Sequence, residues 1–512
     1  MGDTKKTFYI TTPIYYPSAK LHIGHTYCTS VADTIARFKR LAGYDVRFLT
    51  GSDEHGQKIQ RAAEAQGITP LEYTTNIVNG FKALWEKMHI SNDDFIRTTD
   101  PRHEKVVQEL FTKAYEKGDI YKAEYEGWYC TPCESFWTEQ KLGENHTCPD
   151  CGRPVERVKE ESYFFKLGKY TDQWLKFIEE NPDFIQPESR RNEMIQFVKQ
   201  GLEDLAVSRT SFDWGIKVPF DPKHVVYVWL DALTNYITNI GYDVNNSNDL
   251  FKKLWPADLH LIGKDIIRFH TIYWPCFLWS LGLELPKKVY GHPWLLMNNN
   301  KMSKSVGNVI YADDLVEKFG VDAVRYYVLS EISFANDGNI TMEMLIDKIN
   351  SDLANVLGNL VQRTISMGHK YFSGVIINKK LNTSLDEDFI SKINKLDDLV
   401  SSSMDIYHAS DALGYIFDLL RASNKYIDDT TPWVLAKEVE STDRLETVLY
   451  NLLESIRVAG VILRPFIPDT SLSISNQINN YDNSTKYLDD NKYNLGEAKA
   501  LFQRIDKTKF DL

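Results

Sequence analysis

Strand-like and helix-like segments alternate along the first part of this chain, and this alternation limits its fold most. The segment TFYITTPIYY, which begins at Thr7, is rich in β-branched and aromatic residues, as strands are. TSVADTIARFKRLAG then repeats apolar residues at helical spacing and ends on Gly43, a good helix stop. The alternation resumes later with HVVYVWLDALTNY, LHLIGKDIIRFH and KKVYGHPWLLM. This order predicts an α/β domain built on a parallel sheet.

Two departures from the alternation divide the chain. An insertion-like stretch from about residue 118 to 224 contains four of the six cysteines. After about residue 345 strand signals nearly vanish, and amphipathic stretches such as DKINSDLANVLGNLVQRTISM predict an all-helical domain. We therefore expect an α/β domain in two halves, a zinc-binding insertion between them and an α-helical bundle, with boundaries at 1–117, 118–224, 225–345 and 346–512.

Length and charge exclude some classes of protein. A chain of 512 residues is too long for one ordinary core, so two to four domains are expected. The longest apolar run, YWPCFLWSLGL, is too short to span a bilayer, and no signal peptide is recognisable, so a cytoplasmic protein without a membrane partner is expected. The net charge of -12 counts mildly against a large nucleic-acid ligand, although local basic patches can still bind one.

The cysteines form two matched pairs. Cys130-x2-Cys133 and Cys148-x2-Cys151 are separated by fourteen residues. Each short CxxC turn aims two thiolates at one point, and four thiolates suit a tetrahedral zinc ion with no open position. His146 is close enough to compete as a ligand, but the paired spacing favours Cys151. A redox role is less favoured, because a thioredoxin-like site needs only one pair. The pattern predicts structural zinc.

Two histidines lie where the first strand gives way to the first helix. In KLHIGHTY, His22 and His25 flank Gly24. A helix N-terminus attracts phosphate through its unpaired amides and partial positive charge, and two imidazoles add hydrogen-bond donors. A glycine there, without a Cβ, would let a flat base lie against the backbone. The alternative is a pair of half-buried histidines that cap an ordinary helix. The motif alone leaves both interpretations open.

A second stretch favours a nucleotide. NNNKMSKSVGN places Lys301, Ser303, Lys304 and Ser305 within five residues, after a strand-like segment. Two ammonium groups and two hydroxyls on a loop suit a triphosphate whose charge shifts during reaction. Alone, such a loop is usually solvated surface. The two stretches together, in this order and about 280 residues apart, are far more specific. The sequence has no Walker-type loop and no GxGxxG that would offer another nucleotide site.

HIGH together with KMSKS resembles the signature of the class I aminoacyl-tRNA synthetases, and further features resemble the methionyl-tRNA synthetase family. The likeness runs from Phe8 to about Ile505. It implies a Rossmann-like catalytic domain split by a zinc-binding insertion, followed by an anticodon-binding helical bundle. The implied reaction is activation of L-methionine by ATP, with Mg²⁺, to methionyl-adenylate, then transfer of methionine to the 3′ end of tRNA(Met) for protein biosynthesis. The insertion, about 107 residues long, argues against the isoleucyl, valyl and leucyl relatives, which carry a large editing domain.

The resemblance also implies an ATP site and its catalytic residues. Two histidines would contact the phosphates and two lysines would grip the departing pyrophosphate, so the catalytic set is His22, His25, Lys301 and Lys304. The implied ATP-binding set is His22, Gly24, His25, Gly263, Asp265, Lys301, Ser303 and Lys304. The nucleophile in such a reaction is an ionised amino-acid carboxylate, which needs no general base. The sequence accordingly offers no convincing Ser/His/Asp or Cys/His arrangement.

The amino-acid site can be argued in part from the residues. Asp53 follows a strand-like segment, and ligands of doubly wound sheets bind at the carboxyl ends of strands, so this carboxylate could pair with an α-ammonium group. Aromatic walls suit a thioether through sulfur–ring contacts, although any one of these rings could equally belong to a core. The resemblance implies that methionine is lined by Pro13, Ile14, Tyr16, Asp53, Trp229, Ala232, Tyr236, Ile266 and His270.

Three residues of the helical part could read an unpaired base. Asn359 and Arg363 are four residues apart and share a helix face, and Trp433 follows a plausible N-cap and first helical position, Thr431-Pro432. Taken alone, Arg363 suits a solvated face and Trp433 a core. The resemblance implies that all three recognise the anticodon, where amide, guanidinium and indole groups can bind and stack on bases.

Two other functions stay open at this point. One is a different class I synthetase or a HIGH-type nucleotidyltransferase, although small nucleotidyltransferases lack a helical domain of this size. The other is a non-catalytic tRNA-binding paralogue, which the intact HIGH and KMSKS motifs disfavour. A monomer is expected, because the sequence given ends at FQRIDKTKFDL, near where the family's core often ends and before any dimerising extension.

Overall fold

The computed structural model describes residues 5–130, 135–137, 139–149, 151–297, 300–302, 309–332 and 336–510. The chain forms two compact units, each assembled from several stretches of sequence. Unit 1 comprises Met1–Leu21, Gly43–Glu86 and Ser91–His292. Unit 2 comprises His22–Ala42, Lys87–Ile90 and Pro293–Leu512. Among the described residues, no helix has both the length and the apolar character needed to cross a membrane.

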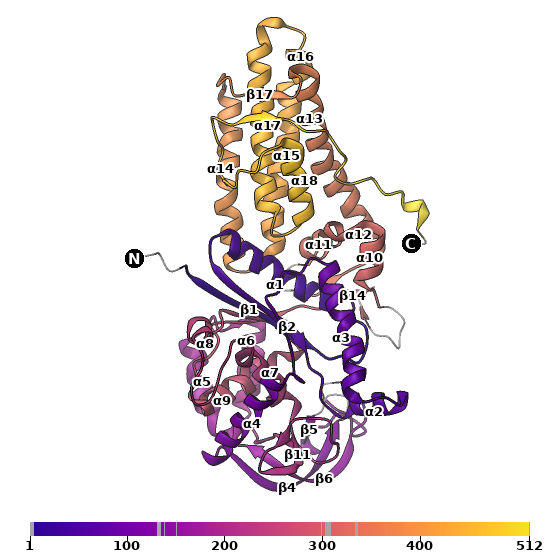
Figure 1. The fold of residues 1–512 in the computed structure, drawn as a ribbon, viewed down its shortest axis with the longest axis vertical. Helices are drawn as coiled ribbons and strands as arrows, with labels where there is room; N and C mark the ends of the chain where they lie inside the picture. The colour runs from indigo at the N-terminus through magenta and orange to yellow at the C-terminus, as the bar shows by residue number, and fades with distance from the viewer. Residues whose placement is uncertain are drawn as a thin grey trace. The chain divides into compact units, whose positions relative to one another are not determined.

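A six-stranded sheet forms the centre of unit 1, with strand order β3-β2-β1-β12-β13-β7. Figure 1 labels two of its strands, β1 and β2. Every neighbouring pair in it is parallel. The strands are β1 (Thr7–Tyr15), β2 (Asp45–Ser52), β3 (Asp94–Arg97), β7 (Ile185–Gln186), β12 (Leu259–Gly263) and β13 (Val289–His292). The inner strands are buried along most of their length, as strands covered by helices on both faces must be. The parallel sheet predicted from the alternation is confirmed.

Helices cover this sheet and supply the other side of its core. They are α2 (Gln57–Gln66), α3 (Pro70–Lys87), α4 (Pro101–Glu116), α7 (Val228–Thr238), α8 (Asp249–Leu254) and α9 (Trp274–Leu281). One buried cluster joins Tyr9 and Leu49 of the sheet to Phe111, Ile237 and Phe277 of the helices α4, α7 and α9. Helix α7, which carries three of the expected site residues, is thereby fixed against the sheet.

The expected insertion contributes a second sheet and one strand of the first. An antiparallel sheet with the order β5-β4-β6-β8 consists of β4 (Ile120–Cys130), β5 (Ser135–Trp137), β6 (Glu156–Phe165) and β8 (Leu205–Ala206). A smaller antiparallel sheet consists of β9 (Ser208–Arg209), β10 (Lys217–Val218) and β11 (Asp221–Val226). Between the helices α5 (Thr171–Glu180) and α6 (Glu188–Lys199), strand β7 returns to the parallel sheet and pairs with β13. The insertion therefore supplies the edge strand of the parallel sheet next to β13.

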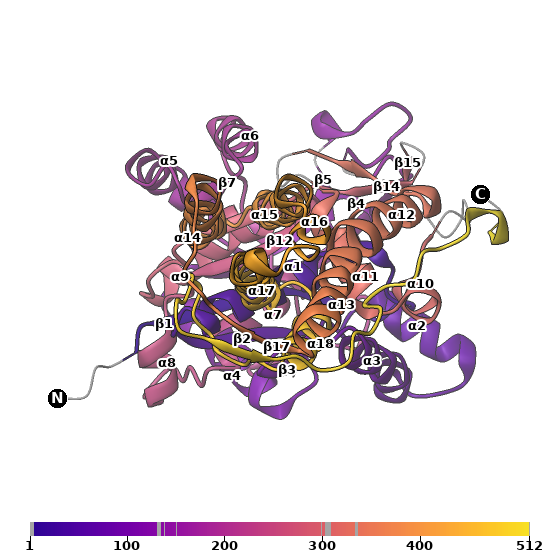
Figure 2. The same ribbon diagram turned by 90° about the horizontal axis from the view of Figure 1, so that it is seen from above.

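Unit 2 is mainly helical (Figures 1 and 2). Its helices are α1 (Ile23–Leu41), α10 (Ala312–Phe319), α11 (Val321–Ser330), α12 (Met342–Lys348), α13 (Asn359–Phe372), α14 (Ser384–Asp405), α15 (Ala409–Thr430), α16 (Pro432–Leu435), α17 (Thr442–Leu463) and α18 (Pro468–Ile478). Figure 2 looks along α14, α15 and α17 nearly end-on. Helix α17 is buried on all sides from Leu445 to Leu463, as its apolar composition requires. The predicted helical domain is confirmed, with one exception: β17 (Val375–Ile377) and β18 (Lys492–Asn494) form an antiparallel pair.

Helix α1 is held inside unit 2 by a buried ion pair. It packs against α11 and α15. Asp33 of α1 lies 2.8 Å from the guanidinium of Arg325 on α11, and neither side chain is exposed. Arg325 also donates to the carbonyl oxygens of Phe466 and Pro465. The helix that begins with the HIGH motif therefore has a fixed position within this unit.

Candidate active site

The carboxyl ends of three neighbouring strands bring several of the expected methionine-site residues to one edge of the parallel sheet. Tyr15 and Ser52 are aligned at the ends of β1 and β2, and the amide of Asp53 donates to the carbonyl oxygen of Tyr15 at 3.1 Å. Strand β12 lies on the other side of β1 and ends at Gly263. Ligands of open parallel sheets bind at such an edge. Tyr16, Asp53 and the segment after Gly263 therefore share one candidate site.

Helix α7 carries Trp229, Ala232 and Tyr236 and packs against the same sheet. Their spacing of three and four residues places them on one helix face. The hydroxyl of Tyr9, on β1, donates to the carbonyl oxygen of Tyr236 at 2.7 Å. The side chains of Ile14, from β1, and Trp229 both pack against the core cluster that contains Tyr236. The first strand and helix α7 are thus in direct contact, and residues more than 200 positions apart line the same region.

Tyr236 and His270 form a buried, uncharged hydrogen-bonded pair. The Tyr236 hydroxyl lies 2.7 Å from His270 Nε2, and His270 Nδ1 lies 3.0 Å from the carbonyl oxygen of Ile266. A carbonyl can only accept, so Nδ1 carries the proton and Nε2 accepts from the tyrosine hydroxyl. Burial lowers the pKa of His270 to about 4, so the ring stays neutral at physiological pH. An uncharged polar pair among rings suits a thioether better than it suits a charged side chain.

An aromatic wall continues from this pair. The ring of Trp229 stacks on Phe269 with centroids 3.8 Å apart, and it meets the His270 ring edge-on at 6.2 Å. Aromatic rings make favourable contacts with a thioether sulfur. Sequence reasoning missed Phe269, whose only signal was its place between two expected site residues in LIGKDIIRFH.

A buried cluster behind the wall was also missed. Asp231 of α7 lies 2.7 Å from His55 Nδ1 and 2.7 Å from His103 Nε2, and all three side chains are buried. Burial alone would raise the pKa of the Asp231 carboxyl, but the two imidazoles outweigh it and hold that pKa below its usual range. Burial would likewise lower the pKa of His55, and Asp231 reverses this effect and raises it. His55 follows Asp53 by two residues, so the cluster ties the Asp53 loop to α7.

The HIGH motif caps helix α1. The Nδ1 of His22 accepts from the amide of Gly24 at 3.0 Å, and the Nδ1 of His25 accepts from the amide of His22 at 3.1 Å. In each neutral ring the proton is therefore on Nε2, the nitrogen turned away from the backbone. A Cβ on Gly24 would lie 2.8 Å from His22 Cε1, so the glycine makes room for this histidine. The capping interpretation is thus correct for both histidines.

The KMSKS stretch begins on a described strand and then leaves the described residues. The backbone of Lys301 belongs to β15 (Asn300–Lys301), which pairs with β14 (Leu295–Met297). The side chain of Lys301, and the whole of Ser303 and Lys304, lie outside the described residues. Beyond the motif, the carbonyl oxygen of Ile310 accepts from the amide of Ile23 at 2.9 Å. The segment that follows KMSKS is therefore bound to the helix that HIGH begins.

Gly263 and Asp265 adjoin each other at the end of β12. A Cβ on Gly263 would lie 2.6 Å from Asp265 Oδ1, which is too close for a normal contact. The glycine therefore lets the exposed carboxylate of Asp265 lie back over the strand end. This is a suitable position for an acceptor of ribose hydroxyls, the role that the resemblance implies.

The cysteine knuckle brings three of the four expected thiols together. The sulfur atoms of Cys130, Cys148 and Cys151 lie within 4.8 Å of one another, and Cys133 lies outside the described residues. The sulfurs of Cys130 and Cys151 are 3.6 Å apart, far longer than a disulfide and near the spacing of about 3.8 Å between thiolates around one zinc ion. The ring of His146 instead packs against Trp128, with ring centroids 4.4 Å apart and the planes tilted by 34°. The donor set fits zinc, with Cys151 rather than His146 in the cluster.

The expected anticodon residues are all exposed. Asn359 and Arg363 lie on one face of α13, and the amide of Asn359 donates to Asn355 Oδ1 at 3.0 Å. Trp433 is 44% exposed, so the alternative that it belongs to the bundle core is wrong. It lies on the short helix α16, which begins with Pro432 as expected. Figure 1 shows α16 at the end of the bundle away from α11.

Comparisons with known proteins agree on one family. Residues 8–365 match the family described as tRNA synthetases class I (M), and residues 377–501 match the anticodon binding domain of methionyl tRNA ligase. The methionine–tRNA ligase of Caldanaerobacter subterraneus subsp. tengcongensis is 58% identical over 99% of this chain and 80% of its own length. That of Clostridium perfringens is 60% identical over 93% of this chain and 74% of its own length. A solved structure of Mycobacterium tuberculosis methionyl-tRNA synthetase in complex with methionyl-adenylate has a TM-score of 0.94 at 42% identity, over 98% of this chain and 100% of that one.

Proposed function

The chain belongs to the methionine–tRNA ligases, which are class I tRNA synthetases. We propose which of its residues bind each substrate and which take part in the reaction. The enzyme activates L-methionine with ATP and transfers the methionyl group to tRNA(Met). The observation that best supports the amino-acid specificity is the neutral Tyr236–His270 pair beside the Trp229–Phe269 wall. Rings can contact a thioether sulfur, and an uncharged hydroxyl can approach it without the desolvation cost of a charge.

In this proposal methionine binds at the carboxyl ends of β1, β2 and β12. The carboxylate of Asp53 pairs with the α-ammonium group, which fixes the orientation of the substrate. The side chain is lined by Pro13, Ile14, Tyr16, Trp229, Ala232, Tyr236, Ile266 and His270. The ionised substrate carboxylate attacks the α-phosphate of ATP, so catalysis rests on positioning and on stabilising charge.

ATP, as its Mg²⁺ complex, is assigned to the two signature motifs and to the end of β12. The imidazoles of His22 and His25, with the amides that begin α1, contact the phosphates. Lys301, Ser303 and Lys304 hold the pyrophosphate as it departs, and Gly263 and Asp265 hold the ribose. Gly24 allows His22 to take its capping position, as described above.

The remaining assignments concern zinc and tRNA. Cys130, Cys133, Cys148 and Cys151 would hold one structural zinc ion, whose role is to fix the strands β4 and β5 to the segment that carries Cys148. Asn359, Arg363 and Trp433 would contact the anticodon of tRNA(Met). We propose the domain boundaries given above, a monomer, and action in the cytoplasm, where tRNA is charged.

ATP–pyrophosphate exchange measured with each of the twenty amino acids tests the proposal. Exchange that depends on methionine, followed by charging of tRNA(Met), is the expected result. Exchange driven best by another amino acid would indicate a different class I synthetase. Binding of tRNA without any exchange would indicate the non-catalytic paralogue.

A further inference from the structure

One loop of the insertion contacts the main chain that follows Asp53. This insertion loop, residues 210–216, connects β9 to β10, and Trp214 lies near its end. The indole Nε1 of Trp214 donates to the carbonyl oxygen of Glu54 at 2.6 Å. In the opposite direction, the amide of Gly56 donates to the carbonyl oxygen of Trp214 at 3.1 Å. Trp214 therefore makes two contacts with the main chain just after Asp53.

Gln60 holds Trp214 in this position. The side-chain Oε1 of Gln60 accepts from two successive amides, those of Asp213 and Trp214, each at 3.0 Å. Gln60 lies in the first half of α2, the helix that follows the Asp53 loop. One residue of the insertion is thus hydrogen-bonded at three points along the chain that leads from Asp53 into this helix.

The indole ring of Trp214 also covers this part of the chain. It meets the ring of His55 edge-on, with centroids 5.3 Å apart. It packs against a small apolar cluster on α2 and α3, and the side chain of Tyr16 packs against the same cluster. Two residues of the proposed methionine site, Asp53 and Tyr16, are therefore each connected to Trp214 through one intermediate contact.

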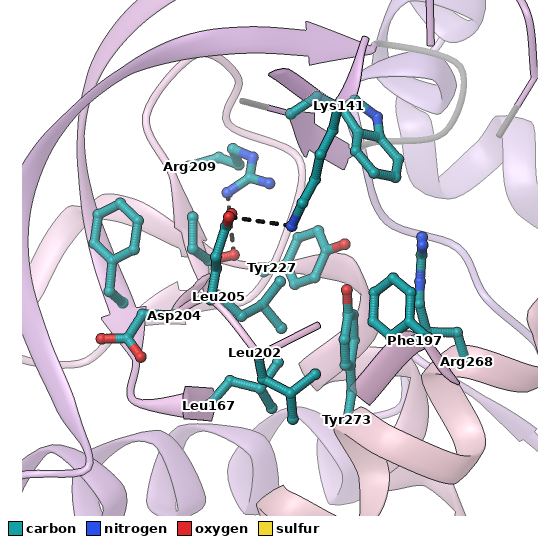
Figure 3. Close-up of a pocket in the computed structure, with 15 residues that line it drawn as sticks. Lys141, Leu167, Phe197, Leu202, Asp204, Leu205, Arg209, Tyr227, Arg268 and Tyr273 are labelled. Atoms are coloured by element: carbon teal, nitrogen blue, oxygen red, sulfur yellow. Dashed lines mark hydrogen bonds and ion pairs between the residues drawn. The ribbon is translucent and has the colours of Figure 1, made fainter. Parts of the chain in front are cut away.

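The insertion loop is fixed at both of its ends. At its start, the Arg209 guanidinium lies 4.7 Å from the ring centroid of Tyr227, and Figure 3 shows both residues on the lining of one cavity. At its end, the carbonyl oxygen of Ile216 accepts from the amide of Val226 on β11 at 2.7 Å. Trp214 is therefore held between a small sheet of the insertion and helix α2.

The side chains beside Asp53 are held separately from the main chain. The carboxylate of Glu54 accepts from the Arg97 guanidinium at 2.6 and 2.8 Å, and His55 is held by Asp231 as described above. Trp214 contacts main-chain groups instead, so its removal would release the peptide units beside Asp53 without breaking either ion pair. We therefore expect the loss of Trp214 to change the geometry of the loop more than the stability of the fold.

A substrate ion pair depends on the exact position of the protein's charged group, which neighbouring contacts must fix. We propose that Trp214, supported by Gln60, is a positioning residue for methionine. It fixes the main chain beside Asp53 and thereby the carboxylate that receives the α-ammonium group. This inference rests on the proposed function of Asp53. It gives the insertion a part in the first step of the reaction, before tRNA is charged.

Two pairs of variants test this inference in the full chain. Trp214→Phe keeps a ring but removes the Nε1 donor. Its control is Trp255→Phe, because Trp255 is another half-buried indole that donates to a main-chain carbonyl, that of Glu284 at 3.0 Å. Gln60→Met removes the acceptor of both amides, whereas Gln60→Glu keeps an oxygen acceptor there. Thermal unfolding of all four variants is measured beside the kinetics.

The first measurement is methionine-dependent ATP–pyrophosphate exchange. In Trp214→Phe and Gln60→Met, KM for methionine should rise about three- to tenfold, the range for losing one net hydrogen bond. The kcat of exchange and KM for ATP should stay within about twofold, because an ammonium contact is made equally in the ground state and the transition state. Trp255→Phe and Gln60→Glu should match the wild type.

Two competitive inhibitors separate binding of the ammonium group from the rest of the methionine site. Methioninol keeps the α-ammonium group and lacks the carboxylate, whereas 4-(methylthio)butanoate keeps the carboxylate and lacks the ammonium group. The inhibition constant of methioninol should rise about three- to tenfold in Trp214→Phe and Gln60→Met. That of 4-(methylthio)butanoate should stay at its wild-type value.

The outcomes separate this inference from the proposed function. An unchanged KM for methionine in Trp214→Phe would overturn the inference, and so would equal weakening of both inhibitors at unchanged thermal stability. Asp53→Asn is measured in parallel. If it weakened methioninol and Trp214→Phe did not, the inference alone would be wrong. If Asp53→Asn also left methioninol binding unchanged, the proposed role of Asp53 would be wrong, and this inference with it.

Discussion

The Nδ1 of His55 lies 2.7 Å from Oδ2 of Asp231, and both side chains are buried. This contact joins the loop that follows Asp53 to the helix that carries Trp229, Ala232 and Tyr236. The same carboxylate also contacts His103 of α4. Two imidazoles therefore hold one buried carboxylate, on the helix that carries three residues of the proposed methionine site.

We expect His55→Gln to destabilise the protein, and more so at acidic than at alkaline pH. The pKa of His55 is raised above its ordinary value of 6.5 in the folded state, because Asp231 outweighs burial. The stabilisation from the charged ring is therefore complete below about pH 6.5 and is lost as pH rises through the raised pKa. Breaking a buried ion pair typically costs about 3–5 kcal/mol. Urea unfolding at several pH values measures the free energy of unfolding of both proteins. The difference between wild type and variant should become smaller above pH 6.5.

A histidine at the surface provides the control for that experiment. His408 lies 3.1 Å from Asp411, and both side chains are well exposed. His408→Gln should change the free energy of unfolding by less than about 1 kcal/mol at every pH, because exposed pairs contribute little. If the loss of unfolding free energy in His55→Gln were the same at every pH, packing and not charge would account for the effect of the substitution.

Tyr236→Phe should weaken the use of methionine without unfolding the protein. The substitution leaves His270 Nε2 buried without its donor, and an unsatisfied buried acceptor costs about 1–3 kcal/mol. We expect kcat/KM for methionine in the exchange reaction to fall about five- to a hundredfold. Tyr481→Phe, which removes an exposed hydroxyl that donates to Asn476, should leave exchange at the wild-type level. If the two variants were equally active, the Tyr236–His270 pair would not belong to the methionine site.

The purified protein should contain one equivalent of zinc per chain. Replacing Cys130 and Cys148 by serine together should abolish it, because two of the four thiolates are lost. Cys276→Ser is the control: burial raises the pKa of that thiol, and it lies away from the knuckle, so zinc content should not change. Elemental analysis of the fresh proteins measures this directly. A wild-type protein free of zinc would refute the structural-metal assignment.

Trp433→Ala should lower tRNA charging but leave amino-acid activation unchanged. The indole is 44% exposed on α16, so it is accessible to a base. Stacking is worth about 1–3 kcal/mol per base, or about a five- to hundredfold loss of charging on truncation. Val439→Ala removes a more exposed apolar side chain of the same region, 90% exposed, and should have little effect. Parallel loss of exchange and charging at unchanged thermal stability would exclude an anticodon contact.

Local sequence patterns determined much of this fold. β-branched strands that alternate with amphipathic helices gave the parallel sheet, because each pattern acts over only a few neighbouring residues. The same holds for the position of HIGH at the start of α1. Motifs also sufficed to identify the family. The roles of individual site residues stay predictions.

Contacts between distant residues were decided only by the tertiary structure. Nothing in the sequence pairs His55 with Asp231, which are 176 positions apart, or places strand β7 at the edge of the catalytic sheet. The contact of the Arg268 guanidinium with the Trp137 ring, 5.4 Å from its centroid, likewise joins two segments that are far apart in the sequence. Secondary structure follows from the periodicity of side chains along the chain. A site depends on which buried polar groups find partners once those elements pack, and this is fixed by the whole fold.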